Sequence, residues 1–420
     1  MPNHRLELLK PYPFQRLNDL LEDVEPVDLP FISLALGEPK HPAADFLINA
    51  YREEDLIRQG FGAYPPTKGL PELRTAIADF LTRRYLLPRE LDPETEVLPV
   101  NGSREGLFAI AQALIEPESK GTTLMPNPFY QIYEGAALLA GTEPVFMNCT
   151  AENGFLPDFD ALDEASLNAC EMMFLCSPGN PSGAVMPIES LQQALSLAAK
   201  YNFIVVSDEC YSEIYADEDA PPPGLLQAAA AMGNDTFEHC ITFNSLSKRS
   251  NLPGLRSGYV AGNADLIKQF LLYRTYHGSA MSVHNQRLSA MAWQDEQHVI
   301  DNRALYRAKY QQFAAAMANV WPMEIPPASF YLWPEIPSGF ESDEVFAKTL
   351  LQETNIKVLP GSYLSRTSAH SSNSAHSQKG AHTQNSTDGV NPGRNRVRMA
   401  LVATLEECLE AAERLNKFLR

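Results

Sequence analysis

The chain has 420 residues, of which 45% are hydrophobic and 20% are charged, a composition typical of a globular protein with two or three domains. Its formal net charge of −19 argues against nucleic acid and anionic membranes as partners, since both carry negative charge. No apolar run approaches the ~18 residues of a membrane span, and residues 1–10 lack the apolar centre of a signal peptide. We therefore expect a cytoplasmic protein that acts on small molecules, and an anionic substrate would need a local group of cations.

The cysteines and histidines do not predict a metal site. The six cysteines include no Cys-x-x-Cys pair and no histidine at ligand spacing, so we expect reduced thiols. Residues 365–391 are rich in Ser, His and Asn, and we expect a disordered surface insertion because almost no apolar side chain is available for burial. His370, His376 and His382 are irregularly spaced within it, which favours solvated side chains over metal ligands.

The first half of the chain contains two turns of functional interest. A short apolar strand from Ile32 ends at Gly37, and a second strand at residues 97–100 leads into Asn101-Gly102-Ser103-Arg104 and a helix. The free backbone N–H groups of a helix N-terminus form an anion site. A serine N-cap preceded by a turn glycine explains the same residues equally well.

Two continuous apolar runs at residues 172–176 and 203–206 predict strands buried on both faces of a parallel sheet. A helical stretch at residues 188–200 separates them, so the three segments form a β-α-β unit. Asn180, Asp208 and Lys248 each follow a predicted strand. Because functional groups gather at the carboxyl ends of parallel strands, we expect these three side chains to converge.

The stretch from residue 242 to residue 259 predicts a cofactor site. A lysine on a rigid loop, such as Lys248, forms a Schiff base with an aldehyde when its amine loses its proton readily. The hydroxyls of Ser245 and Ser247 and the guanidinium of Arg256 suit a phosphate group. Together they indicate pyridoxal 5'-phosphate, an aldehyde that carries a phosphate. A Ser-x-x-Lys pattern alone also fits a solvated turn lysine.

The last part of the chain predicts a smaller unit. Helices are expected at residues 266–276, 285–317, 342–354 and 405–419, and strands at 330–334 and 397–401. We expect three parts: residues 1–40 as an N-terminal arm that joins the small domain, 41–288 as a large cofactor-binding domain, and 289–420 as the small domain.

The order and spacing of these motifs resemble those of the pyridoxal-phosphate-dependent aminotransferases of fold type I (class I/II), over almost the whole chain. The resemblance implies an α/β fold with a large, mixed but mostly parallel, seven-stranded-type sheet and a smaller α+β domain. It implies that the cofactor phosphate is held by backbone amides at Ser103 and Arg104, by Ser245 and Arg256, and by Tyr64 of a neighbouring subunit. It implies that Tyr130 stacks on the cofactor ring, that Asn180 and Tyr211 bind the ring 3'-oxygen, and that Asp208 pairs with the ring nitrogen. Lys248 would form the Schiff base.

The resemblance also implies a substrate site and a homodimer. Arg398, with Asn180 and the Gly37 backbone, would bind the substrate α-carboxylate, and Lys248, Asp208 and Tyr211 would carry the catalysis. Residues 245–258 and 359–364 resemble the bacterial N-succinyldiaminopimelate aminotransferases of lysine biosynthesis. That likeness implies amino transfer between glutamate/2-oxoglutarate and N-succinyl-L,L-2,6-diaminopimelate. A second cation would be needed for the distal carboxylate, and the sequence offers Arg249, Arg274 and Lys68 as candidates.

Other functions remain open at this point. An aromatic or aspartate-type aminotransferase, or a pyridoxal-phosphate C–S lyase, would keep every cofactor residue and change only the substrate walls. A sensing domain of a transcription regulator would also keep Lys248. That reading requires an N-terminal helix-turn-helix and a basic charge, and the sequence shows neither.

Overall fold

The computed structural model describes residues 3–368 and 389–420. His370, His376, His382 and most of the predicted insertion 365–391 therefore lie outside the described residues. Within the described part, no helix has the length and hydropathy needed to cross a membrane.

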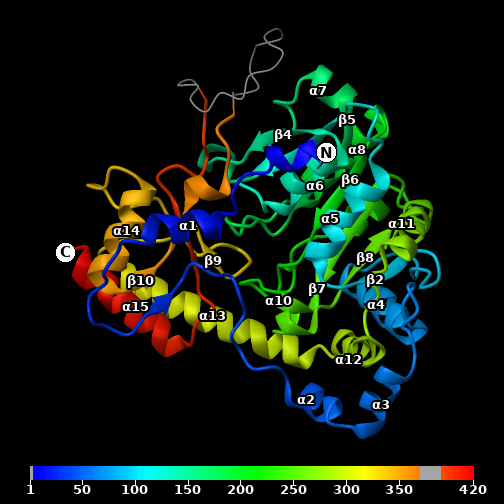
Figure 1. Ribbon diagram of the computed structural model, residues 1–420, viewed down its shortest axis with the longest axis horizontal. Helices are drawn as coiled ribbons and strands as arrows, with labels where there is room; N and C mark the ends of the chain where they lie inside the picture. The colour runs from blue at the N-terminus through cyan, green and yellow to red at the C-terminus, as the bar shows by residue number, and fades with distance from the viewer. Residues whose placement is uncertain (1–2, 369–388) are drawn as a thin grey trace.

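A seven-stranded sheet forms the larger unit, in the order β2-β8-β7-β6-β5-β3-β4 (Figure 1). All neighbouring strands are parallel except where β8 pairs with β2 and with β7. The prediction of a mixed, mostly parallel seven-stranded sheet is confirmed. The strands are β2 (Val97–Val100), β3 (Thr122–Asn127), β4 (Glu143–Asn148), β5 (Cys170–Cys176), β6 (Ile204–Asp208), β7 (Cys240–Ser245) and β8 (Gly258–Gly262).

Helices cover both faces of this sheet, which explains why its strands are continuously apolar. One core lies between the sheet and α4 (Pro71–Arg84), α8 (Ile188–Tyr201), α9 (Leu225–Ala231) and α12 (Val283–Gln294). The other lies between the sheet and α5 (Ser103–Leu114), α6 (Ile132–Ala140) and α11 (Ala264–His277). The large unit also contains α2 (Asp45–Tyr51), α3 (Glu54–Gly62), η2 (Ala151–Asn153), α7 (Glu164–Ala169), α10 (Leu246–Arg249) and η3 (Pro253–Leu255).

The smaller unit has its own core. Its strands are β9 (Tyr331–Leu332), β11 (Leu359–Pro360) and β12 (Val397–Ala400), in the antiparallel order β11-β12-β9, and β1 (Ile32–Ser33) pairs in parallel with β10 (Ile356–Lys357). Its helices are η1 (His4–Leu8), α1 (Pro13–Leu21), α13 (Gln297–Met317), α14 (Asp343–Thr354), η4 (Gly361–Leu364) and α15 (Leu405–Phe418), although η1 reaches across to α6. Figure 1 shows α13 running along the boundary between the two units. We propose the division at residues 40 and 288, although the whole of α12, to Gln294, packs with the large unit.

One helix prediction needs correction, and one of the two interpretations of another helix start is excluded. The helix expected at residues 285–317 is broken into α12 and α13 around Asp295, whose carboxylate accepts a hydrogen bond from the His298 backbone at 3.0 Å. The helix after β2 begins at Ser103, and its N-cap is Gly102 with a φ of 81°. Gly102, not Ser103, is therefore the N-cap residue, and no side-chain hydrogen bond caps the N-terminus of this helix. The backbone N–H groups at this helix start remain available to an anion.

Candidate active site

A cavity of about 400 Å³ opens at the carboxyl ends of the sheet strands. Every residue assigned to the site from sequence lines it except Tyr64: Gly37, Ser103, Arg104, Tyr130, Asn180, Asp208, Tyr211, Ser245, Lys248, Arg256 and Arg398. The predicted convergence of Asn180, Asp208 and Lys248 is thus present in the structure. The Tyr64 side chain is fully exposed, so within this chain it takes no part in the cavity.

Lys248 lies in α10, the short helical turn that follows β7. Its Nζ donates a hydrogen bond to the carbonyl oxygen of Gly37 at 2.9 Å. Burial lowers the pKa of Lys248 to about 8, and the charge of Arg398 acts in the same direction. A substantial fraction of this amine is therefore neutral near pH 8, as a nucleophilic lysine requires.

Asp208 is the last residue of β6 and is 4% exposed. Its carboxylate accepts hydrogen bonds from the Tyr133 hydroxyl at 2.7 Å and from the Cys210 backbone N–H at 3.2 Å. Burial nevertheless raises the pKa of Asp208, with these hydrogen bonds and Lys248 acting against it. A buried carboxylate of this kind is stabilised by a cationic partner, and a protonated pyridine nitrogen has that chemistry.

The residues for a phosphate group surround the start of α5. A Cβ on Gly102 would overlap the Arg256 guanidinium, so the glycine permits the close approach of that cation to the helix N-terminus. The Arg256 Nη1 donates to the Pro253 carbonyl at 2.8 Å. The hydroxyls of Ser245 and Ser247 lie 2.9 Å apart at the same cavity. Backbone amides, hydroxyls and a guanidinium fit a phosphate dianion.

Arg398, on β12 of the smaller unit, also lines the cavity. Its Nη1 donates to Asn180 Oδ1 at 3.1 Å and its Nη2 to the Ala35 carbonyl at 2.8 Å, while its buried Nε has no partner among the described residues. The guanidinium lies 4.4 Å from the ring centroid of Tyr331, which fixes its plane. Arg398 is therefore held with donor capacity left for a carboxylate.

Sequence reasoning missed three residues of this site. Tyr133 bonds Asp208, Tyr331 shares a 3.0 Å contact between hydroxyl oxygens with Tyr211, and Tyr12 from the N-terminal arm lines the cavity mouth. The spacing of Tyr130 and Tyr133 places them one helical turn apart, but aromatic residues in apolar runs are usually core residues. No local signal separated them from the core.

The three cations suggested for a distal carboxylate do not line the cavity. Arg249 is buried against the Ala292 carbonyl and Glu296, Arg274 is paired with Glu105, and Lys68 is paired with Glu94. Arg104 does line it. The Nε of Arg104 donates to the Tyr130 hydroxyl at 2.7 Å and its Nη2 to the Tyr12 hydroxyl at 3.1 Å, and no carboxylate in the described part of the chain pairs with it.

Comparison with known proteins identifies the class. Residues 30–415 match the family described as aminotransferase class I and II, and the chain belongs to that family. A curated relative from Dehalococcoides mccartyi, named LL-diaminopimelate aminotransferase, is 34% identical over 85% of this chain and 90% of its own. Another of that name, from Desulforudis audaxviator, is 32% identical over 85% of this chain and 89% of its own.

Solved structures agree with the fold. An aminotransferase from Neisseria meningitidis is 45% identical, with a TM-score of 0.89 and complete coverage of both chains. A probable N-succinyldiaminopimelate aminotransferase from Thermus thermophilus is 25% identical, with a TM-score of 0.80 over 96% of this chain and 99% of that one. The chain is thus a fold-type I enzyme that transfers amino groups between small amino and oxo acids, and its family uses pyridoxal 5'-phosphate. The residues of the cavity fit that cofactor.

Proposed function

We propose that this enzyme transfers an amino group between glutamate/2-oxoglutarate and N-succinyl-L,L-2,6-diaminopimelate. The observation that carries the proposal is Arg104, a cation at the cavity mouth that has no acidic partner among the described residues. Arg104 lies on α5 of the large unit and Arg398 on β12 of the smaller unit, and both line the cavity. A substrate with two distant carboxylates can engage Arg398 with one and Arg104 with the other.

The cavity residues have complementary roles in this proposal. Bound pyridoxal 5'-phosphate supplies an aldehyde and a ring that withdraws electrons from the substrate Cα. The Lys248 amine holds the cofactor and then takes the proton from the substrate Cα, for which a pKa of about 8 is suited. Asp208, held by Tyr133, would stabilise positive charge on the ring nitrogen. Tyr211 and Asn180 orient the ring, and Arg398 orients the substrate.

A second candidate substrate is free L,L-diaminopimelate. The names of the curated relatives favour it, and it shares the distant carboxylate. The two differ because the free compound presents an ammonium group beside that carboxylate, whereas the succinylated compound presents an amide and a further carboxylate. A cation such as Arg104, in a site with Tyr12 and Tyr130 hydroxyls, suits the second pattern better, since it repels an ammonium.

The test is a panel of amino acceptors with glutamate as donor. We expect N-succinyl-2-amino-6-oxopimelate to give the highest kcat/KM. Arg104→Gln should lower that value by about 10- to 100-fold, the cost of a lost charged contact of ~1.4–3 kcal/mol, and should leave pyruvate, which has no distal carboxylate, unchanged. Arg104→Lys, the control, keeps the charge and should recover part of the loss. Equal losses for both acceptors would show that Arg104 serves the cofactor.

We also propose a homodimer in which Tyr64 completes the cofactor site of the partner. Its fully exposed side chain at the end of α3 supports this, because a tyrosine without neighbours in its own chain is free to contact another subunit. Mixing Tyr64→Phe chains, whose homodimer is impaired at both sites, with inactive Lys248→Ala chains should restore part of the activity, because one site of the heterodimer then combines Lys248 and Arg256 of one chain with Tyr64 of the other. A fully active monomer in sedimentation measurements contradicts the proposal.

A further inference from the structure

One tyrosine touches three functional parts of the active site at once. Tyr331 lies on β9 of the smaller unit, is 3% exposed and lines the active-site cavity. Its hydroxyl oxygen lies 3.0 Å from that of Tyr211, and the centroid of its ring lies 4.4 Å from the guanidinium carbon of Arg398. A Cβ on Gly37 would overlap the Tyr331 hydroxyl, so this hydroxyl is packed against the residue whose carbonyl accepts from Lys248.

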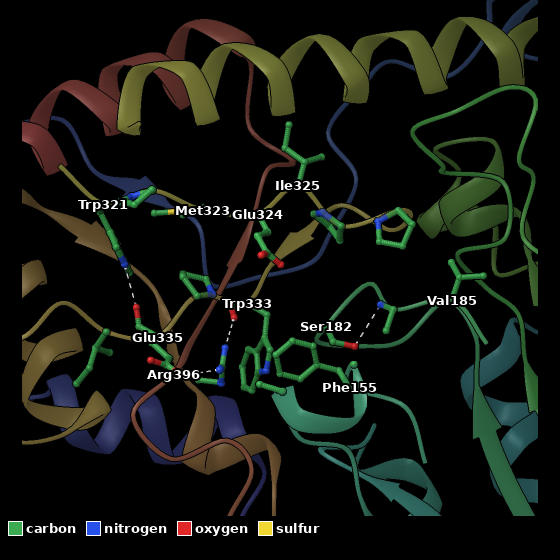
Figure 2. A pocket seen from close by; sticks show the side chains of 18 of the residues that line it. Phe155, Ser182, Val185, Trp321, Met323, Glu324, Ile325, Trp333, Glu335 and Arg396 are labelled. Carbon is green, nitrogen blue, oxygen red and sulfur yellow. Dashed lines mark hydrogen bonds and ion pairs between the residues drawn. The ribbon is translucent and has the colours of Figure 1, made fainter. Parts of the chain in front are cut away.

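The backbone on both sides holds this tyrosine at the active site. The Tyr331 carbonyl accepts a hydrogen bond from the Tyr310 hydroxyl at 2.8 Å, and β9 pairs with β12. Leu332 packs in the core of the smaller unit. Trp333 lines a separate cavity of about 770 Å³, where its carbonyl accepts from Arg396 at 2.9 Å (Figure 2). These contacts fix the strand, and with it the position of the Tyr331 ring.

The direction of the hydrogen bond between the two tyrosines follows from counting protons. A tyrosine hydroxyl has a single proton to donate. With the Tyr211 proton donated to the 3'-oxygen of the cofactor ring, as the family resemblance implies, the bond between the tyrosines is donated by Tyr331. Burial raises the pKa of Tyr211 well above the ordinary value of a phenol, and Tyr331 acts in the same direction, so Tyr211 keeps its proton. The two bonds then form a chain in which each polarises the other.

We propose that Tyr331 is a positioning residue that serves both the cofactor and the substrate. Its hydroxyl, acting through Tyr211, strengthens the hydrogen bond to the 3'-oxygen. Its ring face holds Arg398 in the plane that receives the substrate carboxylate. A tyrosine that only filled space would be replaced by phenylalanine without effect. The inference rests on the cofactor site of the proposed function and is independent of which amino acceptor the enzyme uses.

An absorbance titration of the holoenzyme tests the hydroxyl. The bound cofactor changes its visible absorbance when it takes up a proton beside the 3'-oxygen, and a donor to that oxygen favours the form without the proton. Tyr331→Phe keeps the ring and removes the donor. The midpoint of the titration should therefore rise by about 0.3–1 pH unit, the size of one neutral hydrogen bond.

The matched control is Tyr306→Phe. The Tyr306 hydroxyl is buried in the same cluster as Tyr331 and Tyr211, and it has no hydrogen-bond partner among the described residues. Its removal takes away a buried tyrosine hydroxyl without cutting the chain to the cofactor. The midpoint in this variant should stay at the wild-type value.

A double-mutant cycle shows whether Tyr331 acts through Tyr211. Tyr211→Phe alone should raise the midpoint more than Tyr331→Phe does, because it removes the direct donor. Adding Tyr331→Phe to Tyr211→Phe should give no further rise, since the chain is already cut. Additive shifts would show that Tyr331 acts independently of Tyr211 and would overturn the proposal.

Binding of glutarate, which is glutamate without its amino group, tests the ring. Calorimetry on the holoenzyme, at a pH above all the titration midpoints, should give wild-type affinity for Tyr331→Phe, which keeps the ring beside Arg398. Tyr331→Leu should bind glutarate about 2- to 5-fold more weakly, the loss of a cation–π contact. Equal affinity in Tyr331→Leu and the wild type would overturn the role of the ring.

The titration also separates this proposal from the cofactor site on which it rests. An unchanged midpoint in Tyr331→Phe with a raised midpoint in Tyr211→Phe would leave Tyr331 as a packing residue and overturn the proposal alone. An unchanged midpoint in both variants would also remove Tyr211 from the 3'-oxygen. If Tyr331→Phe does not fold, Gly37→Ala decides, because its methyl group displaces the Tyr331 hydroxyl and should raise the midpoint; an unchanged midpoint there overturns the proposal.

Discussion

Replacing Tyr133 by phenylalanine isolates the support given to Asp208. The Tyr133 ring is fully buried and stacks on Phe174 with centroids 4.8 Å apart and planes 10° apart. Phenylalanine keeps this packing and removes only the hydroxyl that donates to Asp208 Oδ2 at 2.7 Å. The change therefore acts on one hydrogen bond to a buried carboxylate.

The size of the expected effect follows from the negative charge on Asp208, which accepts the hydrogen bond. A hydrogen bond to a charged group contributes about 1.5–3 kcal/mol. Burial already raises the pKa of Asp208, so this carboxyl contributes stability at low pH that is lost as pH rises through its folded pKa. Removing the Tyr133 donor raises that pKa further and makes the ionised form, which the ring nitrogen needs, harder to reach.

We expect Tyr133→Phe to weaken binding of pyridoxal 5'-phosphate at least about tenfold at pH 7.5 and to lower kcat. Equilibrium dialysis of the apoenzyme measures the first and steady-state turnover the second. The control is Tyr310→Phe, which removes a hydroxyl that donates to the Tyr331 carbonyl at 2.8 Å and contacts no carboxylate. Unchanged cofactor affinity in Tyr133→Phe, or an equal loss in Tyr310→Phe, would refute the reasoning.

Three further outcomes are expected. Acylation of Lys248 in the apoenzyme, followed by mass spectrometry, should show a midpoint near pH 8, because its depressed pKa frees the neutral amine well below the usual ~10.4; a midpoint near 10 contradicts the burial argument. Arg398→Lys should lower kcat/KM about 10- to 100-fold for glutamate and for every acceptor alike, since a bidentate contact is lost; a loss confined to one acceptor would make Arg398 a specificity residue. Replacing residues 370–387 by a short Gly-Ser link should shift Tm by less than about 2 °C. The reason is that Ser368 and Val390 already join the two ends of the segment by backbone hydrogen bonds of 3.1 and 2.9 Å. A fall in Tm of many degrees would mean that the segment packs.

The sequence predicted the parts of the fold that depend on local pattern. The runs at β5 and β6 are apolar throughout because helices cover both sheet faces. The break between α12 and α13 was missed because His298 and Asp295 have no strong helix-breaking tendency. Their contact forms only when the turn is already present, so helical periodicity on both sides concealed it.

The same distinction, between local pattern and tertiary contact, separates the site residues that the sequence predicted from those that it did not. Lys248, Asp208 and Asn180 follow strands, and the rule that strand ends converge was sufficient to group them. Tyr133, Tyr331 and the free side chain of Arg104 could not be found this way, because each acquires its role from a partner far away in sequence: Tyr133 from Asp208, 75 positions on, and Tyr331 from Tyr211, 120 positions back. Arg104 was assigned to the phosphate through its backbone, and only the packing of Tyr12 and Tyr130 against it reveals that its guanidinium is held at the mouth of the cavity. Site residues that directly follow strands are thus visible in sequence, whereas those to which our proposal gives charge tuning or the far end of the substrate depend on tertiary contacts.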